Sequence, residues 1–193
     1  LLVVLYISCD KNSSFRSSDN DMRDSMLNQA ERAVSQSAPN AFSLIQKGMK
    51  QCKDSFYYYR YCILLGNVYR LNAKPDSMII FSKKALKYAE RQKKTPEINA
   101  MLGAAYEEHA IYYYFFRMKS DSCIYYHRKA YQYMMESGNM DKTPDICANM
   151  ADAYVQNNDI VKAAYWYRRA LFLTDSPNLP HPENLSRSSR LAP

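Results

Sequence analysis

The sequence predicts an all-α fold in which helices pack as antiparallel pairs. Three observations lead to this class. First, a large apolar residue, a small residue beside it and an aromatic three positions after the small residue recur along the chain. Second, the 193 residues include only 4 Gly, fewer than sheet proteins and phosphate-binding loops need. Third, hydrophobic residues form 47% of the chain and recur at helical intervals, which favours a folded core. The three copies are Leu65-Gly66-Asn67-Val68-Tyr69, Leu102-Gly103-Ala104-Ala105-Tyr106 and Met150-Ala151-Asp152-Ala153-Tyr154.

Each copy predicts one closely packed helix pair. The small residue lets a second helix approach at one point, and alanines further along supply the matching flat surface. A unit of this kind cannot bury its apolar face alone, so copies must stack on one another. We therefore expect binding rather than catalysis. The residues expected at these contacts are Leu65, Gly66, Tyr69, Ala85, Leu102, Gly103, Tyr106, Ala130, Met150, Ala151, Tyr154, Ala163, Tyr167 and Ala170.

Local signals place eight helices along the chain. Met22 and Met26 begin the apolar stripe of the first helix, and Pro39 suits the first position of the second. Thr95-Pro96-Glu97 and Thr143-Pro144-Asp145 both combine a capping hydroxyl, a proline and an acid, which is typical of a helix start. The expected ranges are 20–36, 39–52, 54–72, 76–92, 96–118, 120–137, 143–156 and 160–174.

The middle copy is longer than the other two. Cys123 lies 17 positions after Tyr106, whereas Ala163 lies nine positions after Tyr154. Eight extra residues lengthen each helix of that pair by about one turn, or roughly 6 Å. The added part carries five successive aromatics at 112–116. They either pack against longer neighbouring helices or form an exposed knob that docks a partner.

The pattern resembles tetratricopeptide repeats, which are helix–turn–helix units of about 34 residues. The third copy matches at all six characteristic positions. The first carries Met78 and Ser82, and the second Cys123 and His127, where the family has small and aromatic residues. The pair at 20–52 matches mainly by its position. The resemblance covers about 150 residues, and it implies a right-handed α-solenoid that binds a protein or peptide.

The same resemblance implies that the first helix of each pair lines a ligand groove. The groove would begin basic and become acidic, so that it could hold a carboxylate at one end and a basic segment at the other. The implied groove residues are Arg60, Asn67, Arg70, Glu107, Glu108, Asp152 and Gln156.

The ends of the chain lead to further expectations. Residues 1–8 are almost wholly apolar and are followed by Cys9, which resembles the end of a bacterial lipoprotein signal peptide with Cys9 as the lipidated residue. Eight apolar residues are too few for a membrane helix; a core segment or a truncated membrane helix is the alternative. We expect a signal segment at 1–9, a polar tether at 10–19, the repeat domain at 20–176 and an irregular tail at 177–193.

The last helix carries three apolar residues for which little following sequence offers cover: Trp166, Leu171 and Phe172. These uncovered residues predict self-association.

Other classes of function find little support. The three His residues lack zinc-helix spacing, no Gly-rich phosphate loop exists, and no Cys-x-x-Cys pair occurs, so we expect no enzyme, metal or cofactor. The net charge is +7, but the densest run of basic residues, at 83–94, has the spacing of the solvent-exposed face of an amphipathic helix. Direct nucleic-acid binding is therefore not expected.

The leading expectation is a non-catalytic scaffold, anchored to a bacterial membrane by lipid and facing the periplasm or cell surface. The alternative is the sensory input domain of a longer signalling protein with a membrane helix and a kinase or helix-turn-helix output. A cytoplasmic chaperone adaptor is a weaker third reading, which requires that Cys9 is never lipidated.

Overall fold

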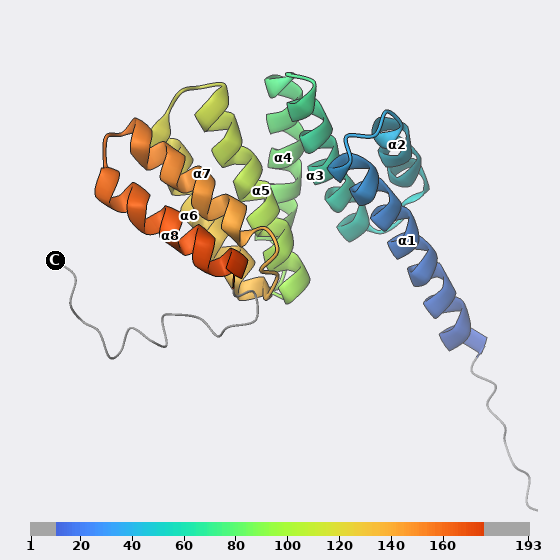
Figure 1. Cartoon of the computed structure of the whole chain (residues 1–193). Coiled ribbons are helices and arrows are strands. Elements are labelled where there is room, and N and C mark those ends of the chain that lie inside the picture. The colour runs from blue at the N-terminus through green and yellow to red at the C-terminus, as the bar shows by residue number, and fades with distance from the viewer. Residues whose placement is uncertain (1–10, 176–193) are drawn as a thin grey trace, which may run out of the picture. The chain divides into compact units, whose positions relative to one another are not determined.

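The computed structural model describes residues 11–175, with side chains from Met22 onward, and in this part of the chain helices alternate with short turns and loops (Figure 1). By packing, the chain divides into two compact units after Ala85, which lies inside the fourth helix. Helices contact mostly their neighbours in sequence. The eight helices are α1 (Lys11–Ser35), α2 (Ala41–Gln51), α3 (Ser55–Leu71), α4 (Pro75–Glu90), α5 (Pro96–Phe115), α6 (Ser120–Ser137), α7 (Thr143–Gln156) and α8 (Ile160–Asp175).

The first unit holds α1, α2, α3 and the beginning of α4. Both α2 and α3 pack against α1, and the three helices share one apolar core. Leu27 of α1, Ile45 of α2 and Leu65 of α3 are buried in this core. Each of these helices therefore uses one apolar face, as the helical periods in the sequence predict.

The second unit holds the end of α4 with α5, α6, α7 and α8. Helix α5 packs on α6, α6 on α7 and α7 on α8. Met150 and Ala153 of α7 are fully buried against Cys123 and Ile124 of α6. Gly103 shows why a small residue is needed in such a pair, because a Cβ there would lie 2.8 Å from Met134 Cγ.

Helix ends follow local chemistry, with three departures from expectation. Thr95 caps α5 by accepting a hydrogen bond from the Ile98 amide, and Gly138 ends α6 at φ +73°. Thr143 lies inside α7 instead, and its hydroxyl donates to the Met140 carbonyl. Helix α2 begins at Ala41, after Pro39. Helix α1 begins at Lys11, where a tether was expected, because residues 11–19 contain no Gly or Pro to stop a helix.

Four helix pairs share one kind of turn. A non-glycine residue with positive φ follows two or three positions after the end of the first helix of each pair: Ser37, Ala73, Met118 and Asn158. In three of these turns, the amide of the next residue donates to the carbonyl five positions earlier, as in Schellman motifs. These bonds run from Ala38 to Ala33, from Lys74 to Tyr69 and from Asp159 to Tyr154.

Candidate functional site

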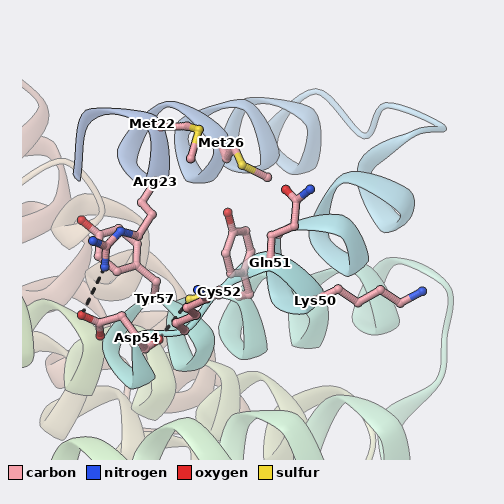
Figure 2. A pocket seen from close by; sticks show the side chains of 11 residues that line it. Met22, Arg23, Met26, Lys50, Gln51, Cys52, Asp54 and Tyr57 are labelled. Carbon is pink, nitrogen blue, oxygen red and sulfur yellow. Dashed lines mark hydrogen bonds and ion pairs between the residues drawn. The ribbon is translucent and has the colours of Figure 1, made fainter. Parts of the chain in front are cut away.

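A half-open cavity of about 720 Å³ lies in the first unit, between α1, the end of α2 and the start of α3. Figure 2 shows Met22 and Met26 on α1 above the space, with Tyr57 and Asp54 on the opposite side. A cavity of this size falls within the usual range for ligand sites. The lining residues are Met22, Arg23, Met26, Gly48, Lys50, Gln51, Cys52, Lys53, Asp54, Tyr57 and Tyr61.

The floor of the cavity depends on Gly48. A Cβ at this position would lie 2.2 Å from Cζ of Tyr61 and 2.5 Å from its hydroxyl oxygen. Only glycine therefore lets the Tyr61 ring lie against α2, where it is 2% exposed. This contact places the end of the ring at the cavity and fixes the spacing between α2 and α3.

The short link between α2 and α3 forms one wall. Asp54 caps α3, since its Oδ1 accepts a hydrogen bond of 2.8 Å from the Phe56 amide. The Cys52 thiol donates to the Asp54 carbonyl oxygen over 3.0 Å. Burial raises the pKa of the Cys52 thiol above its ordinary value, so the thiol is protonated at neutral pH and is a poor nucleophile.

The charges around the cavity are predominantly positive. Arg23, Lys50 and Lys53 line it together with a single carboxylate, Asp54. Arg23 lies 3.7 Å from Asp54 and 5.7 Å from the centre of the Tyr57 ring (Figure 2). One cation thus offsets the carboxylate, and the two lysines remain exposed at the rim.

Tyr57 is held by a second contact outside the cavity. Its hydroxyl donates to Asp24 Oδ1 over 2.7 Å. Burial, reinforced by this bond, raises the pKa of Tyr57 to about 12, so the phenol stays neutral. The ring therefore offers the cavity an apolar surface rather than an acid or a base.

The groove residues expected on α3 already have partners within the chain. Arg60 makes an ion pair of 2.5 Å with Glu31 of α1, and Arg70 donates to Asn67 Oδ1 over 2.9 Å. The Arg70 Nε atom is buried, however, and has no hydrogen-bond partner among the described residues. Arg70 therefore has one buried donor that makes no hydrogen bond within the described residues.

The groove residues expected in the second unit are also engaged. Asp152 accepts a hydrogen bond from the Tyr167 hydroxyl, and Gln156 accepts one from the Ser120 hydroxyl. Glu108 is 3% exposed and Glu107 is half-buried. Only Gln156 among these four residues is exposed, so this face offers few accessible polar groups.

The residues expected at the repeat contacts lie mostly inside the two units. Tyr69 stacks on Phe81, with ring centres 5.6 Å apart, and Tyr106 stacks on Tyr133 at the same distance. Tyr167 is 39% exposed. The buried members are Leu65, Gly66, Ala85, Leu102, Gly103, Ala130, Met150, Ala151, Tyr154, Ala163 and Ala170.

Metal-ligating side chains, cysteines and membrane-spanning helices were the remaining features to locate in the described part of the chain. It holds no group of three or more His, Cys, Asp or Glu side chains that could bind a metal ion. Its four cysteines are free, and burial raises the pKa of Cys62 to about 11 and of Cys123 and Cys147 to about 12.

Within residues 11–175, every helix is too short or too polar to span a membrane. Cys9, the expected lipid attachment site, lies outside the described residues.

The cavity was not predicted from the sequence. Met22 and Met26 belong to the apolar stripe recognised there, and their spacing alone reads as core. A possible signal was the pair of methionines four residues apart, since flexible thioethers often line adaptable binding surfaces. What makes the site is the placement of α1 over the α2–α3 link, which no local pattern encodes.

Comparison with known proteins adds no assignment to this geometry. A scan against known protein families finds no match for the chain, and a search of curated proteins finds no similar sequence. Residues 11–175 thus form eight helices, packed as sequential antiparallel pairs, with a basic, methionine-lined cavity in the first unit.

Proposed function

We propose that this chain is a non-catalytic scaffold that captures a segment of another protein or a peptide. The cavity of the first unit is the observation that carries this proposal. Its apolar lining of methionine and tyrosine is bordered by three cations and one carboxylate. This combination suits a ligand that presents an apolar side chain next to a negative charge.

The tetratricopeptide architecture is part of the same proposal. It is supported by the large and small residues of the recurring pattern, which are buried in all three copies, and by the turn that recurs in four helix pairs. The turn at Ser37 extends the recurrence to the pair α1–α2, whose sequence matches the repeat least. In this architecture the pairs would continue as a right-handed solenoid, and recognition would be preorganised by packed helices.

The ligand chemistry follows from the residues at the rim and inside. Met22 is 57% exposed and can adjust to an entering aliphatic or aromatic side chain without disturbing the core. Lys50 and Lys53 then attract a carboxylate at the rim, while Arg23 remains paired with Asp54. An acidic, apolar peptide is therefore favoured over a basic one.

Fluorescence anisotropy with a labelled peptide of alternating Glu and Leu tests this proposal. The full chain should bind it at least tenfold more tightly than a matched Lys/Leu peptide. The variant Lys50→Glu/Lys53→Glu should lose at least tenfold in affinity, or about 1.4 kcal/mol, and Met22→Ser should also weaken binding. Each of these positions is exposed, so the fold should be retained.

The matched control is Lys83→Glu/Lys87→Glu, which makes the same charge change on the exposed face of α4. It should leave the affinity within about twofold of the wild type. Equal loss in both double variants would mean that net charge alone attracts the peptide. Equal binding of the acidic and basic peptides would contradict a specific site in the cavity.

Membrane anchoring through Cys9 completes the proposal and places the scaffold in the periplasm or at the cell surface of a bacterium. The apolar residues 1–8 before Cys9 support it. Replacing Cys9 by Ala should move the protein from the membrane fraction to the soluble fraction. Unchanged fractionation would contradict the anchor and leave the cavity proposal intact.

A further inference from the structure

Helix α8 presents an apolar face that nothing covers among the described residues. Val161 is 83% exposed, Leu171 is 65% exposed and Ile160 is 58% exposed. Ala164 and Arg168 are exposed between them, at helical spacing along the same stripe. The other side of α8 packs on α7 through Ala163, Ala170 and Leu173.

The equivalent face of α6 is covered by α7. In the repeat register, Ala163 and Ala170 of α8 correspond to Cys123 and Ala130 of α6, a shift of 40 positions. The same shift relates three exposed residues of α8 to residues of α6 that contact α7, whereas Val161 and Ile160 correspond to Asp121 and Ser120, which hydrogen-bond to Asn157 and Gln156. The corresponding pairs are Ile124 with Ala164, Arg128 with Arg168, and Tyr131 with Leu171.

The contacts between α6 and α7 show how such a face is occupied. Ile124 packs in a buried cluster with Met150 and Tyr154 of α7. The Arg128 guanidinium donates to the Tyr154 hydroxyl over 2.8 Å. Tyr131 packs against the cluster that contains Cys147. A helix in this position thus supplies apolar contacts on both sides of one acceptor for an arginine.

We infer that the exposed face of α8 binds an acidic amphipathic helix of a partner protein, seated as α7 is seated on α6. Arg168 would donate to a carboxylate of that helix, while Val161 and Leu171 contact its apolar side chains. An acceptor is needed because burial of an unpaired arginine is costly. This interface lies in the second unit and is independent of the cavity proposed above.

Charge and access argue against a second copy as the occupant. In a twofold contact between two copies of α8, each copy would bring its own Arg168 into the interface. In addition, two chains of net charge +7 repel each other. The matching surface of α7 is not available either, because Met150 and Ala153 are fully buried on α6. Self-association was expected from Trp166, Leu171 and Phe172 of α8, but Trp166 and Phe172 pack against buried clusters, and only Leu171 of the three is exposed.

The test uses a labelled, stapled peptide that copies α7, residues 143–156, with Cys147→Ala and Tyr154→Glu. A second peptide carries Lys at the position of the Glu. The full chain should bind the Glu peptide at least tenfold more tightly than the Lys peptide. Arg168→Glu should reverse this preference, and Leu171→Arg should weaken both peptides at least tenfold. Arg91→Glu, at an exposed site beyond α4, should change neither affinity.

Three outcomes would overturn the inference. The first is that the wild-type chain binds neither peptide, as it would if another part of the chain covered the face. The second is binding that survives Leu171→Arg and Arg168→Glu, since the peptide would then replace α7. The third is a wild-type dimer in sedimentation equilibrium that Leu171→Arg converts to a monomer, which would assign the face to a second copy.

Discussion

His127 carries a polar group into the interior of the second unit. It is 1% exposed, and its Nδ1 atom has no hydrogen-bond partner among the described residues. Burial lowers the pKa of His127 from 6.5 to about 4, because the charged form loses its hydration. The side chain is therefore neutral in the folded protein at pH 7.

This depressed pKa predicts a loss of stability in mild acid. The unfolded chain takes up a proton near pH 6.5, whereas the folded chain takes it up only near pH 4. The free energy of unfolding should therefore fall as the pH is lowered from 6.5 to 4, by about 2 kcal/mol between pH 7.5 and pH 5. Urea unfolding at both pH values measures the change. His127→Leu should remove most of this difference, and an equal difference in the variant would contradict the assignment to His127.

The burial of His127 could be inferred from its place in the recurring pattern, where tetratricopeptide repeats, which the pattern resembles, have an aromatic residue. Its missing partner could not be inferred, because that depends on the groups which α5 and α7 bring near it. The same limit applies to Arg60 and Glu31, which are 29 positions apart and form an ion pair that no local pattern indicates.

At the scale of elements, the turns between paired helices carry strain. Ala73 has φ 51° and Asn158 has φ 59° at equivalent places in their pairs. The left-handed conformation costs about 1–2 kcal/mol for a residue with a Cβ, less for Asn, and little for Gly. The Schellman hydrogen bonds after both residues hold this geometry in place.

Ala73→Gly should therefore stabilise the chain. Relief of the left-handed strain exceeds the entropy lost by glycine, so we expect a gain of about 0.5–1 kcal/mol in the free energy of unfolding. Asn158→Gly should gain less, because Asn already tolerates this conformation. Thermal and urea unfolding of the two variants measure the difference. A destabilised Ala73→Gly would mean that the alanine methyl group contributes packing that outweighs the strain.

Most of the elements were predictable because their signals are local. The Thr95 cap before Pro96 and the Gly138 stop are both where sequence rules place them. The same rules misplaced Thr143, whose hydroxyl is held by the Met140 carbonyl, and they missed the first turns of α1. At Thr143 a backbone carbonyl competes for the hydroxyl that was expected to cap α7. At the start of α1 no glycine or proline stops the helix, so it begins earlier than expected.

At the scale of the whole molecule, the net positive charge favours the acidic ligands that we propose. The formal net charge is +7, and the cavity adds a local excess of cations. Long-range attraction of this kind accelerates association with acidic ligands and is screened by salt.

The all-helical fold class was predictable from the recurring pattern. The cavity was not predictable, because its shape depends on how three helices are placed relative to one another.

Affinity for an acidic, apolar peptide should therefore fall with ionic strength. Between 50 and 500 mM NaCl we expect the Kd of the Glu/Leu peptide to rise roughly tenfold, because the Debye length falls well below the distances between exposed charges. A neutral Gln/Leu peptide should change little over the same range. A salt-independent Kd for the acidic peptide would show that Lys50 and Lys53 do not contribute to binding.

The unequal lengths of the helix pairs bear on how this protein can be changed. Helices α5 and α6 have 20 and 18 residues, whereas α7 and α8 have 14 and 16, and the extra length lies at the α5–α6 turn. Most of the added aromatics fold back, as Tyr113 does on Tyr126, while Phe115 and Met118 at the tip stay 65% and 71% exposed. The tip is consequently a natural insertion point, where an epitope or a reporter loop can be grafted without redesigning the helix seams.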